Sequence, residues 1–343
     1  MHLPPKALDV VLKLKGFSVS PRRSGLGMLS WLLAAASASA SAAAAPIDLS
    51  QLCSSGNCVV STDATVGSAS GPLTVPGNFT VNSGVVLQFL VPVRIKVDGD
   101  MLLSGTVGAP GNGGDGGSGG APGQPGGAGG NAPSVASGIF DVKGSITINS
   151  TAVATTEGGT GGSGGSGATG QSGGAGGTGG AGGSLTFNTC SSFTGNAGAQ
   201  IVVNGGTGGV GQAGAVGGAG GAAGTVTVNA KSAIVNNAAV RALGGAGGIG
   251  GVSAGASGSS GSISLSSLST VTVGAGSLDA GANTPTISPS QASISALDFC
   301  APPAPIPTLS EWTGILLSSL MAMLALWRLR RVRASRAPLM RGN

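Results

Sequence analysis

Residues 140–149 read FDVKGSITIN, and residues 95–104, which read IKVDGDMLLS, repeat the same order of apolar and polar residues. Alternation with a period of two predicts short strands that bury one face. Similar segments start at Phe79, Leu185, Val226 and Ile263, and second short strands are predicted at 152–154, 200–203, 240–243 and 271–273. The chain is therefore predicted to be a repeat protein.

The predicted fold class is all-β, a parallel β-helix or solenoid. From Met101 onward the repeated segments start 37 to 45 residues apart. A repeat of this size cannot bury its apolar side alone, whereas stacked repeats form one continuous core. The last repeat, from Ser262 to about Ala282, has little more than the bare length of one rung, about 20 residues. We therefore expect short rungs, with insertions in the other repeats.

These insertions consist mainly of glycine. Every third residue from Gly105 to Gly129, and again from Gly158 to Gly182, is Gly. This period fits polyproline-II-like glycine helices, which have three residues per turn and could pack side by side on their glycine faces. Disordered loops are the alternative, because ordering glycine costs more backbone entropy than ordering any other residue. Collagen needs more triplets and more proline than these runs contain.

Polar side chains on the outer face of the strands are predicted to stack in two columns. One column holds Thr147, Thr186 and Thr227, and the other holds Asn149, Asn188 and Asn229. Such a ladder suits polysaccharide binding, or ordered water as in an ice- or surface-binding protein. The alternative is that threonine favours exposed strands and that like residues stack well in solenoids.

The N-terminus has the layout of a secretory signal peptide. Basic residues up to Arg23 precede an apolar run, Leu26 to Ala36, and then a stretch of small residues, ASASASAAAA. We expect cleavage near residues 42–44. The chain is therefore predicted to be exported.

Four cysteines in an exported chain predict disulfides. Cys53 and Cys58 are close enough in sequence to close a local loop, which leaves Cys190 and Cys300 to pair by default. A metal site is the alternative, but the sole histidine, His2, lies in the leader. No metal or other cofactor is expected.

The C-terminal tail is predicted to contain a transmembrane helix. Thr308 and Glu311 have the spacing of a capping box, and no residue from Trp312 to Trp327 is charged. This run covers roughly 24 Å, short of the ~30 Å hydrocarbon core, but terminal tryptophans and snorkelling arginines could extend it. The arginines, expected on the cytoplasmic side, are Arg328, Arg330, Arg331 and Arg333. The alternative is a soluble amphipathic helix, although the run is apolar on all sides.

The sequence IPTLSEW, followed by an apolar helix and an arginine cluster, resembles the IPTL-CTERM sorting domain of Gram-negative surface proteins. The motif residues are Ile306, Pro307, Thr308, Leu309, Ser310, Glu311 and Trp312. The resemblance implies recognition and removal of the tail by an exosortase-type membrane protease, in bacteria that make extracellular polysaccharide. It extends only to about Arg333, and Thr313 stands where the family pattern has glycine.

The body between the two ends is acidic, although the whole chain has a formal charge of +5. Between Pro46 and Pro305, five Lys and Arg residues face nine carboxylates, which leaves about −4. Nucleic-acid binding is therefore not expected. The predicted domains are the leader (1–45), an N-terminal β region and cap (46–100), the glycine-rich solenoid (101–284), a Ser/Pro-rich spacer (285–307) and the sorting segment with its basic tail (306–343).

The sequence predicts an exported structural or adhesive protein of the cell surface, not an enzyme. Its expected partners are the secretion machinery, the inner membrane that holds the precursor, an exosortase-type protease, and polysaccharide of an extracellular or biofilm matrix. A β-helical carbohydrate-active enzyme is the alternative, since such enzymes cluster charged residues in one groove. The only candidate cluster is Arg94, Lys96, Asp98 and Asp100, which a solvated edge explains better.

Overall fold

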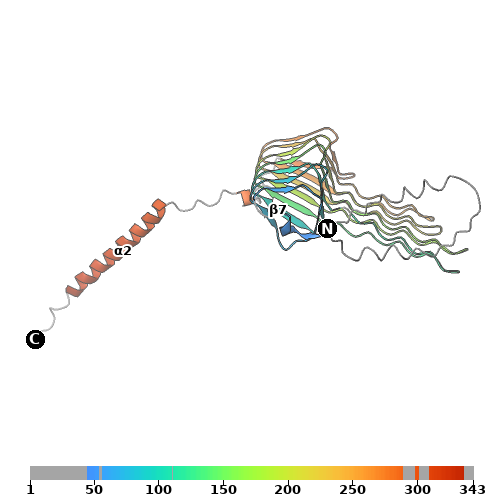
Figure 1. The fold of residues 1–343 in the computed structure, drawn as a ribbon, viewed down its shortest axis with the longest axis horizontal. Helices are drawn as coiled ribbons and strands as arrows, with labels where there is room; N and C mark the ends of the chain where they lie inside the picture. Colours follow the sequence, from blue (N-terminus) through green and yellow to red (C-terminus); the bar gives the residue numbers. More distant parts are fainter. Residues whose placement is uncertain (1–44, 54–55, 110, 289–297, 301–308, 336–343) are drawn as a thin grey trace, which may run out of the picture. The chain divides into compact units, whose positions relative to one another are not determined.

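The structure is a computed structural model. It describes residues 45–53, 56–109, 111–288, 298–300 and 309–335 (Figure 1). The predicted signal peptide lies almost wholly outside these residues, as do the first three residues of the sorting motif.

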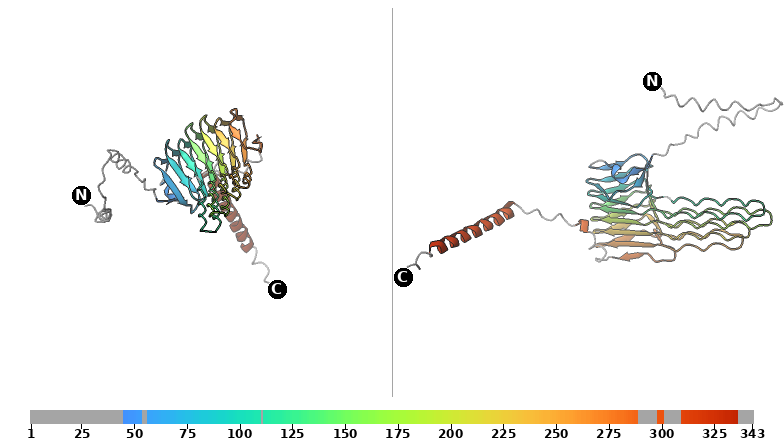
Figure 2. Two further views of the ribbon diagram at one scale, coloured as in Figure 1. Left: turned by 90° about the vertical axis from the view of Figure 1, so that its right-hand side faces the viewer. Right: turned by 90° about the horizontal axis from the view of Figure 1, so that it is seen from below.

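The body is a stack of rungs, each of which contributes one strand to each of three parallel sheets (Figure 2). In stacking order, sheet A contains β1 (Ile47–Asp48), β3 (Ala64–Ser68), β6 (Val86–Phe89), β9 (Thr106–Gly108), β12 (Val153–Thr155), β15 (Gln200–Val202), β18 (Ala239–Arg241) and β21 (Leu278–Asp279). Sheet B contains β2 (Cys58–Val60), β5 (Phe79–Val81), β8 (Met101–Leu103), β11 (Ile146–Ile148), β14 (Phe193–Gly195), β17 (Ile234–Asn236) and β20 (Val271–Val273). Sheet C contains β4 (Leu73–Val75), β7 (Val93–Val97), β10 (Gly138–Val142), β13 (Leu185–Thr189), β16 (Thr225–Ala230), β19 (Ser262–Ser267) and β22 (Thr286–Ser288).

This architecture agrees with the predicted parallel β-solenoid, and the bare rung is about as short as expected. Leu73 in β4 pairs with Ile95 in β7, which places successive rungs 22 residues apart where no insertion intervenes. Between β7 and β10, Ile95 pairs with Phe140, 45 residues later. The additional residues leave the stack between a sheet A strand and the next sheet C strand. The insertions therefore lengthen the chain without changing the rung.

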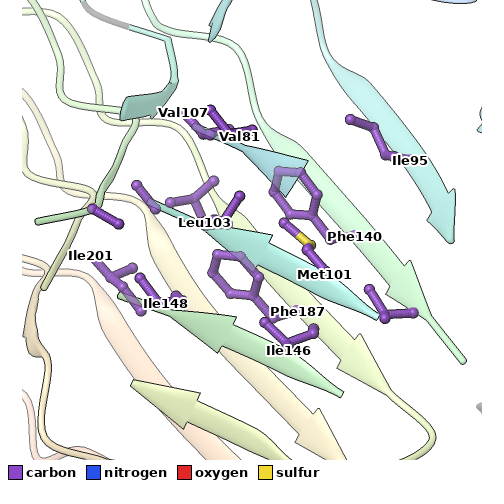
Figure 3. Packing of buried hydrophobic residues seen from close by; sticks show 14 of the residues in the cluster. Val81, Ile95, Met101, Leu103, Val107, Phe140, Ile146, Ile148, Phe187 and Ile201 are labelled. Atoms are coloured by element: carbon purple, nitrogen blue, oxygen red, sulfur yellow. The ribbon is translucent and has the colours of Figure 1, made fainter. Parts of the chain in front are cut away.

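The core lies inside the stack and follows the period-2 pattern. In β7, Val93, Ile95 and Val97 are buried, whereas the residues between them are exposed. Like residues stack between rungs: the rings of Phe140 and Phe187 are 5.2 Å apart and nearly parallel (Figure 3). Burying a side chain of this kind stabilises the fold by about 1.5–3 kcal/mol. Continuous columns of such residues replace the single compact core of a globular domain.

Each rung has three strands, and the two-strand repeat predicted from the sequence is wrong in its register. Residues 95–99 and 140–144 do stack on each other, as predicted. The segments at Met101 and Ile146, however, belong to sheet B, whereas those at Leu185, Val226 and Ile263 belong to sheet C. The predicted second strand at 271–273 likewise lies in sheet B. Period-2 alternation is the same on all three sides, so it does not reveal which side a strand occupies.

The glycine runs are ordered and form four stacked hairpins, residues 111–137, 156–184, 203–224 and 242–261, here called the glycine fin (Figures 1 and 2). Their backbone hydrogen bonds recur at every third residue. Gly161 and Gly164 donate to Thr207 and Val210 in the next hairpin. This is the spacing expected of side-by-side helices with three residues per turn, so the ordered alternative holds.

Both predicted disulfides are present. Cys53 is bonded to Cys58, and Cys190 is bonded to Cys300 across 110 residues of sequence. Cys300 ends the short helix η2 (Asp298–Cys300), which the second disulfide fastens to the end of β13. The C-terminal end of the body is therefore held against sheet C.

The first rung begins with a capped 3₁₀ helix, η1 (Leu49–Gln51). Asp48 is its N-cap, and its carboxylate accepts hydrogen bonds from the backbone and hydroxyl of Ser50 and from the hydroxyl of Ser68 on the next rung. These bonds, those of Ser50 first, hold the pKa of Asp48 well below its ordinary value. The cap thus ties the first rung to the second.

Candidate functional site

The outer face of sheet C carries a continuous column of polar side chains. Asp141, Asn188, Asn229 and Ser266 occupy equivalent positions on successive rungs. The amide nitrogen of Asn188 donates to the carboxylate of Asp141 (2.8 Å), and that of Asn229 donates to the amide oxygen of Asn188 (2.9 Å). Asn188 thus uses one donor and one acceptor along the column. Asp141 and Ser266 are buried, whereas Asn188 and Asn229 are half-buried. This column is here called the Asp/Asn ladder.

Two of the residues predicted for the ladder lie elsewhere. Thr147 is on sheet B, where it pairs with Thr194. Asn149 follows the same strand and donates to the Ser104 hydroxyl (2.8 Å). The prediction for Thr147 and Asn149 was wrong because it placed the segment ITIN on the same side as LTFN. The predicted positions of Thr186 and Thr227 were correct, because these two residues are paired on sheet C.

Asp141 occupies the position next to Asn188 that was predicted for Asn149. Its side chain is only 1 % exposed, although it lies on the outer face. The Arg94 guanidinium of the preceding rung lies 2.6 Å from it, and Asn188 donates to it from the other side. A buried carboxylate requires such partners. In the sequence, the match between IKVDG and FDVKG aligns Asp141 with Lys96. It does not indicate that Arg94 is the ion-pair partner of Asp141.

Of the four charged residues considered for catalysis, Arg94, Asp98 and Asp100 form contacts between rungs, and Lys96 lines the hollow described below. Arg94 is occupied by Asp141, and Asp98 pairs with Lys143 (2.7 Å). Asp100 accepts the backbone N–H of Ser145 (2.7 Å) at the turn into sheet B. Each carboxylate therefore links one rung to the next. These contacts give the charges a structural use.

A shallow hollow of about 240 Å³ adjoins the ladder at its first rungs. Its walls come from the strand ends of sheet C and from η2, which the Cys190–Cys300 disulfide holds there. The lining residues are Thr74, Lys96, Val97, Asp98, Asp141, Lys143 and Phe299. An aromatic ring beside charged and hydroxyl groups is chemistry suited to a sugar ring.

The tail forms the helix α2 (Leu309–Ser335). It begins directly after Thr308, the predicted N-cap, which itself lies outside the described residues. Over residues 316–330, where its side chains are described, the apolar residues are exposed, for example Leu316 and Met323, at 66 % each. Among the residues that the structure describes, no helix is both long enough and apolar enough to cross a membrane. The transmembrane prediction for the tail is corrected accordingly: the uncharged run is short, and arginines follow it directly.

Comparison with protein-family models gave one match, to residues 304–331. The matching model describes the IPTL-CTERM motif. The C-terminal segment carries an IPTL-CTERM motif. Comparisons with curated proteins and with solved structures gave no match. The family match covers only the C-terminal tail and concerns the sorting of the chain. The role of the body has to be inferred from its own structure.

The IPTL-CTERM motif implies processing by an exosortase-type system and indicates a surface protein sorted through its C-terminus. Four of its residues, Leu309 to Trp312, form the first turn of α2, whereas Ile306, Pro307 and Thr308 precede the helix. The match ends within the arginine cluster and includes Arg328, Arg330 and Arg331, but not Arg333.

Proposed function

We propose that the chain is an exported surface protein whose solenoid and glycine fin serve as a structural or adhesive element bound to extracellular polysaccharide. The observation that carries this proposal is the IPTL-CTERM motif at residues 304–331. The paired charges of Asp98 and Asp141 support a structural use of the body, because both carboxylates are committed to contacts between rungs.

Polysaccharide is the proposed partner because sheet C presents hydrogen-bonding groups at the spacing of the rungs. The half-buried amides of Asn188 and Asn229 and the neighbouring hydroxyl row of Thr186, Thr227 and Ser264 repeat along the stack. Neutral hydroxyl and amide groups in such rows match the repeated hydroxyl groups of a glycan chain. The hollow at Phe299 offers a place for one ring of that chain.

Processing of the tail is tested by the intact mass and the cell fraction of the protein in its native host. The wild type is expected to lack the leader and the residues beyond the sorting motif. Pro307→Ala and Trp312→Ala are expected to accumulate uncut, because both alter the motif. Ser335→Ala, which lies beyond the matched residues, is the control and should be processed normally. A wild-type protein that keeps its arginine-rich tail would overturn cleavage by a sorting protease.

Glycan binding is tested separately with the mature protein and the polysaccharide of the same cells in a co-sedimentation assay. Thr186→Leu combined with Thr227→Leu removes adjacent hydroxyls from sheet C and should weaken binding several-fold. The matched control is Thr147→Leu combined with Thr194→Leu, an equivalent pair on sheet B. Equal binding by both double variants would show that sheet C is not the glycan-binding face.

A further inference from the structure

In the glycine fin, each of the four hairpins forms one layer, and the layers are numbered in chain order. The first half of each hairpin is its outgoing strand and the second half is its returning strand. Each layer packs directly against the next through bare backbone, which makes the fin a lattice. In the second layer, a Cβ on Gly162 would lie 1.8 Å from the Asp115 carbonyl oxygen of the first layer. On the returning strand, a Cβ on Gly176 would lie 1.9 Å from the Gly209 carbonyl oxygen of the third layer. Side chains are therefore excluded from these inner positions.

The contacts between layers show which positions of each hairpin face the preceding layer and which face the following layer. In the outgoing strands, Gly159, Gly162 and Gly165 face the preceding layer. In the returning strands, Gly217 and Gly220 of the third layer face the following layer, where a Cβ on each would lie within 2.0 Å of a carbonyl oxygen. These five positions, which lie away from the solenoid, are all glycine. Nearer the solenoid, Ala223 continues the series of Gly217 and Gly220.

The first layer breaks this rule on its open side. Gly114 and Gly117 contact the returning strand of their own hairpin, as Gly161 and Gly164 do in the second layer. This register makes Asn112, Asp115 and Ser118 the equivalents of Gly159, Gly162 and Gly165. They carry exposed side chains exactly where a preceding layer would have to pack.

The last layer breaks the rule on the opposite side. Gly255 and Gly258 contact the third layer in the same way that Gly218 and Gly221 contact the second. Ala254 and Ser257 are therefore the equivalents of Gly217 and Gly220, the positions that would face a following layer. Both are exposed. Each end of the stack thus has side chains where the interior has glycine.

We infer that these five residues cap the glycine lattice and prevent a second copy of the chain from stacking on the fin. An open lattice edge resembles the edge strand of a sheet, which proteins block with charges and side chains. Asp115 adds a like-charge penalty, because a symmetric pair of first layers would bring two carboxylates together. The outgoing and returning strands of every hairpin are antiparallel and pack against each other in the lattice. The first layer of a two-fold related copy could therefore pack against this first layer in the same way once the capping side chains are removed.

The test is a triple variant, Asn112→Gly with Asp115→Gly and Ser118→Gly, compared with wild type by sedimentation velocity over a range of concentrations. The wild type should remain monomeric, and the triple variant should dimerise as concentration rises. The matched control adds three glycines at side-chain positions that face no layer: Thr160→Gly, Ser163→Gly and Ser166→Gly. It should remain monomeric, because it opens no new lattice face.

Two results would overturn the inference. One is a triple variant that stays monomeric up to millimolar concentration while its far-UV circular dichroism matches that of wild type. The other is equal association by the control variant, which would attribute the effect to glycine content alone. Ala254→Gly with Ser257→Gly provides an independent check at the other end of the stack. It should also promote association, and failure of both variants would rule out capping.

Discussion

Two glycines in adjacent layers of the fin, Gly162 and Gly116, have different surroundings. A Cβ on Gly162 would meet a backbone oxygen at 1.8 Å, whereas on Gly116 the nearest atom would lie 3.9 Å away. Glycine at position 162 is therefore required by packing. At position 116 it only adds flexibility to the unfolded chain. Neither position belongs to the every-third-residue runs that start at Gly105 and Gly158, so the sequence period does not distinguish them, and only the contacts between layers do.

Gly162→Ala should loosen the fin, because the layers must separate to admit the methyl group. Overpacking of this kind costs about 1–3 kcal/mol. Gly116→Ala, the matched control, should be neutral or stabilise by up to about 1 kcal/mol through a smaller unfolded-state entropy. Amide hydrogen exchange within residues 156–184 measures the difference. Equal protection in the two variants would contradict lattice packing.

The Asp48 cap should make the first rung sensitive to acid. Because its pKa is lowered in the folded protein, its stabilising contribution is complete above the ordinary value of 3.8 and is lost as the pH falls below it. Hydrogen exchange in β3 should therefore increase between pH 4 and pH 2 in the wild type. Asp48→Asn should remove that dependence. A carboxyl that titrates near pH 4 in an NMR experiment would show that the cap is absent in solution.

At the scale of elements, the two disulfides differ in what they join. Cys53–Cys58 closes a local loop of the first rungs, whereas Cys190–Cys300 fastens η2 to sheet C across most of the solenoid. The sequence paired all four cysteines correctly because one pair was so close. It did not indicate that the second disulfide places Phe299 beside Lys96 and Asp141 at the hollow.

Removing the long-range disulfide with Cys190→Ala and Cys300→Ala should destabilise the body more than Cys53→Ala with Cys58→Ala. The chain-entropy model gives roughly 5 kcal/mol for a loop of this length and about 2 kcal/mol for the short loop. Urea unfolding followed by circular dichroism measures both. Similar midpoints for the two variants would show that the long loop is already constrained in the unfolded chain.

In the body as a whole, the solenoid and the fin are stabilised by different interactions. Most core residues lie in the strands of the rungs. Val203 and Ala242, at the base of the fin, also belong to the core, whereas the rest of the fin is held mainly by backbone hydrogen bonds. Rungs without an insertion occur in the same chain, where residues 90–92 connect β6 to β7. The solenoid therefore takes only a few residues of its hydrophobic core from the base of the fin.

Replacing all four hairpins of the fin with connections as short as residues 90–92 should leave the solenoid folded. The shortened chain should keep its far-UV β signal and unfold cooperatively, because the stacked apolar columns remain. Full-length protein under the same conditions is the reference. Loss of the β signal or of cooperative unfolding would show that the fin contributes to the stability of the rungs.

The sequence alone determined the repeat, the parallel solenoid, the disulfide pairs and the IPTL-CTERM motif, because period-2 alternation, cysteine spacing and a short linear motif are all local patterns. It misplaced Thr147 and Asn149, since three equivalent sides share one alternation. It also could not decide whether the glycine runs are ordered. Tertiary structure decided these points, because the register between rungs and between layers depends on contacts between residues about 40 positions apart, and those contacts also place Arg94 on Asp141 and Gly162 against Asp115.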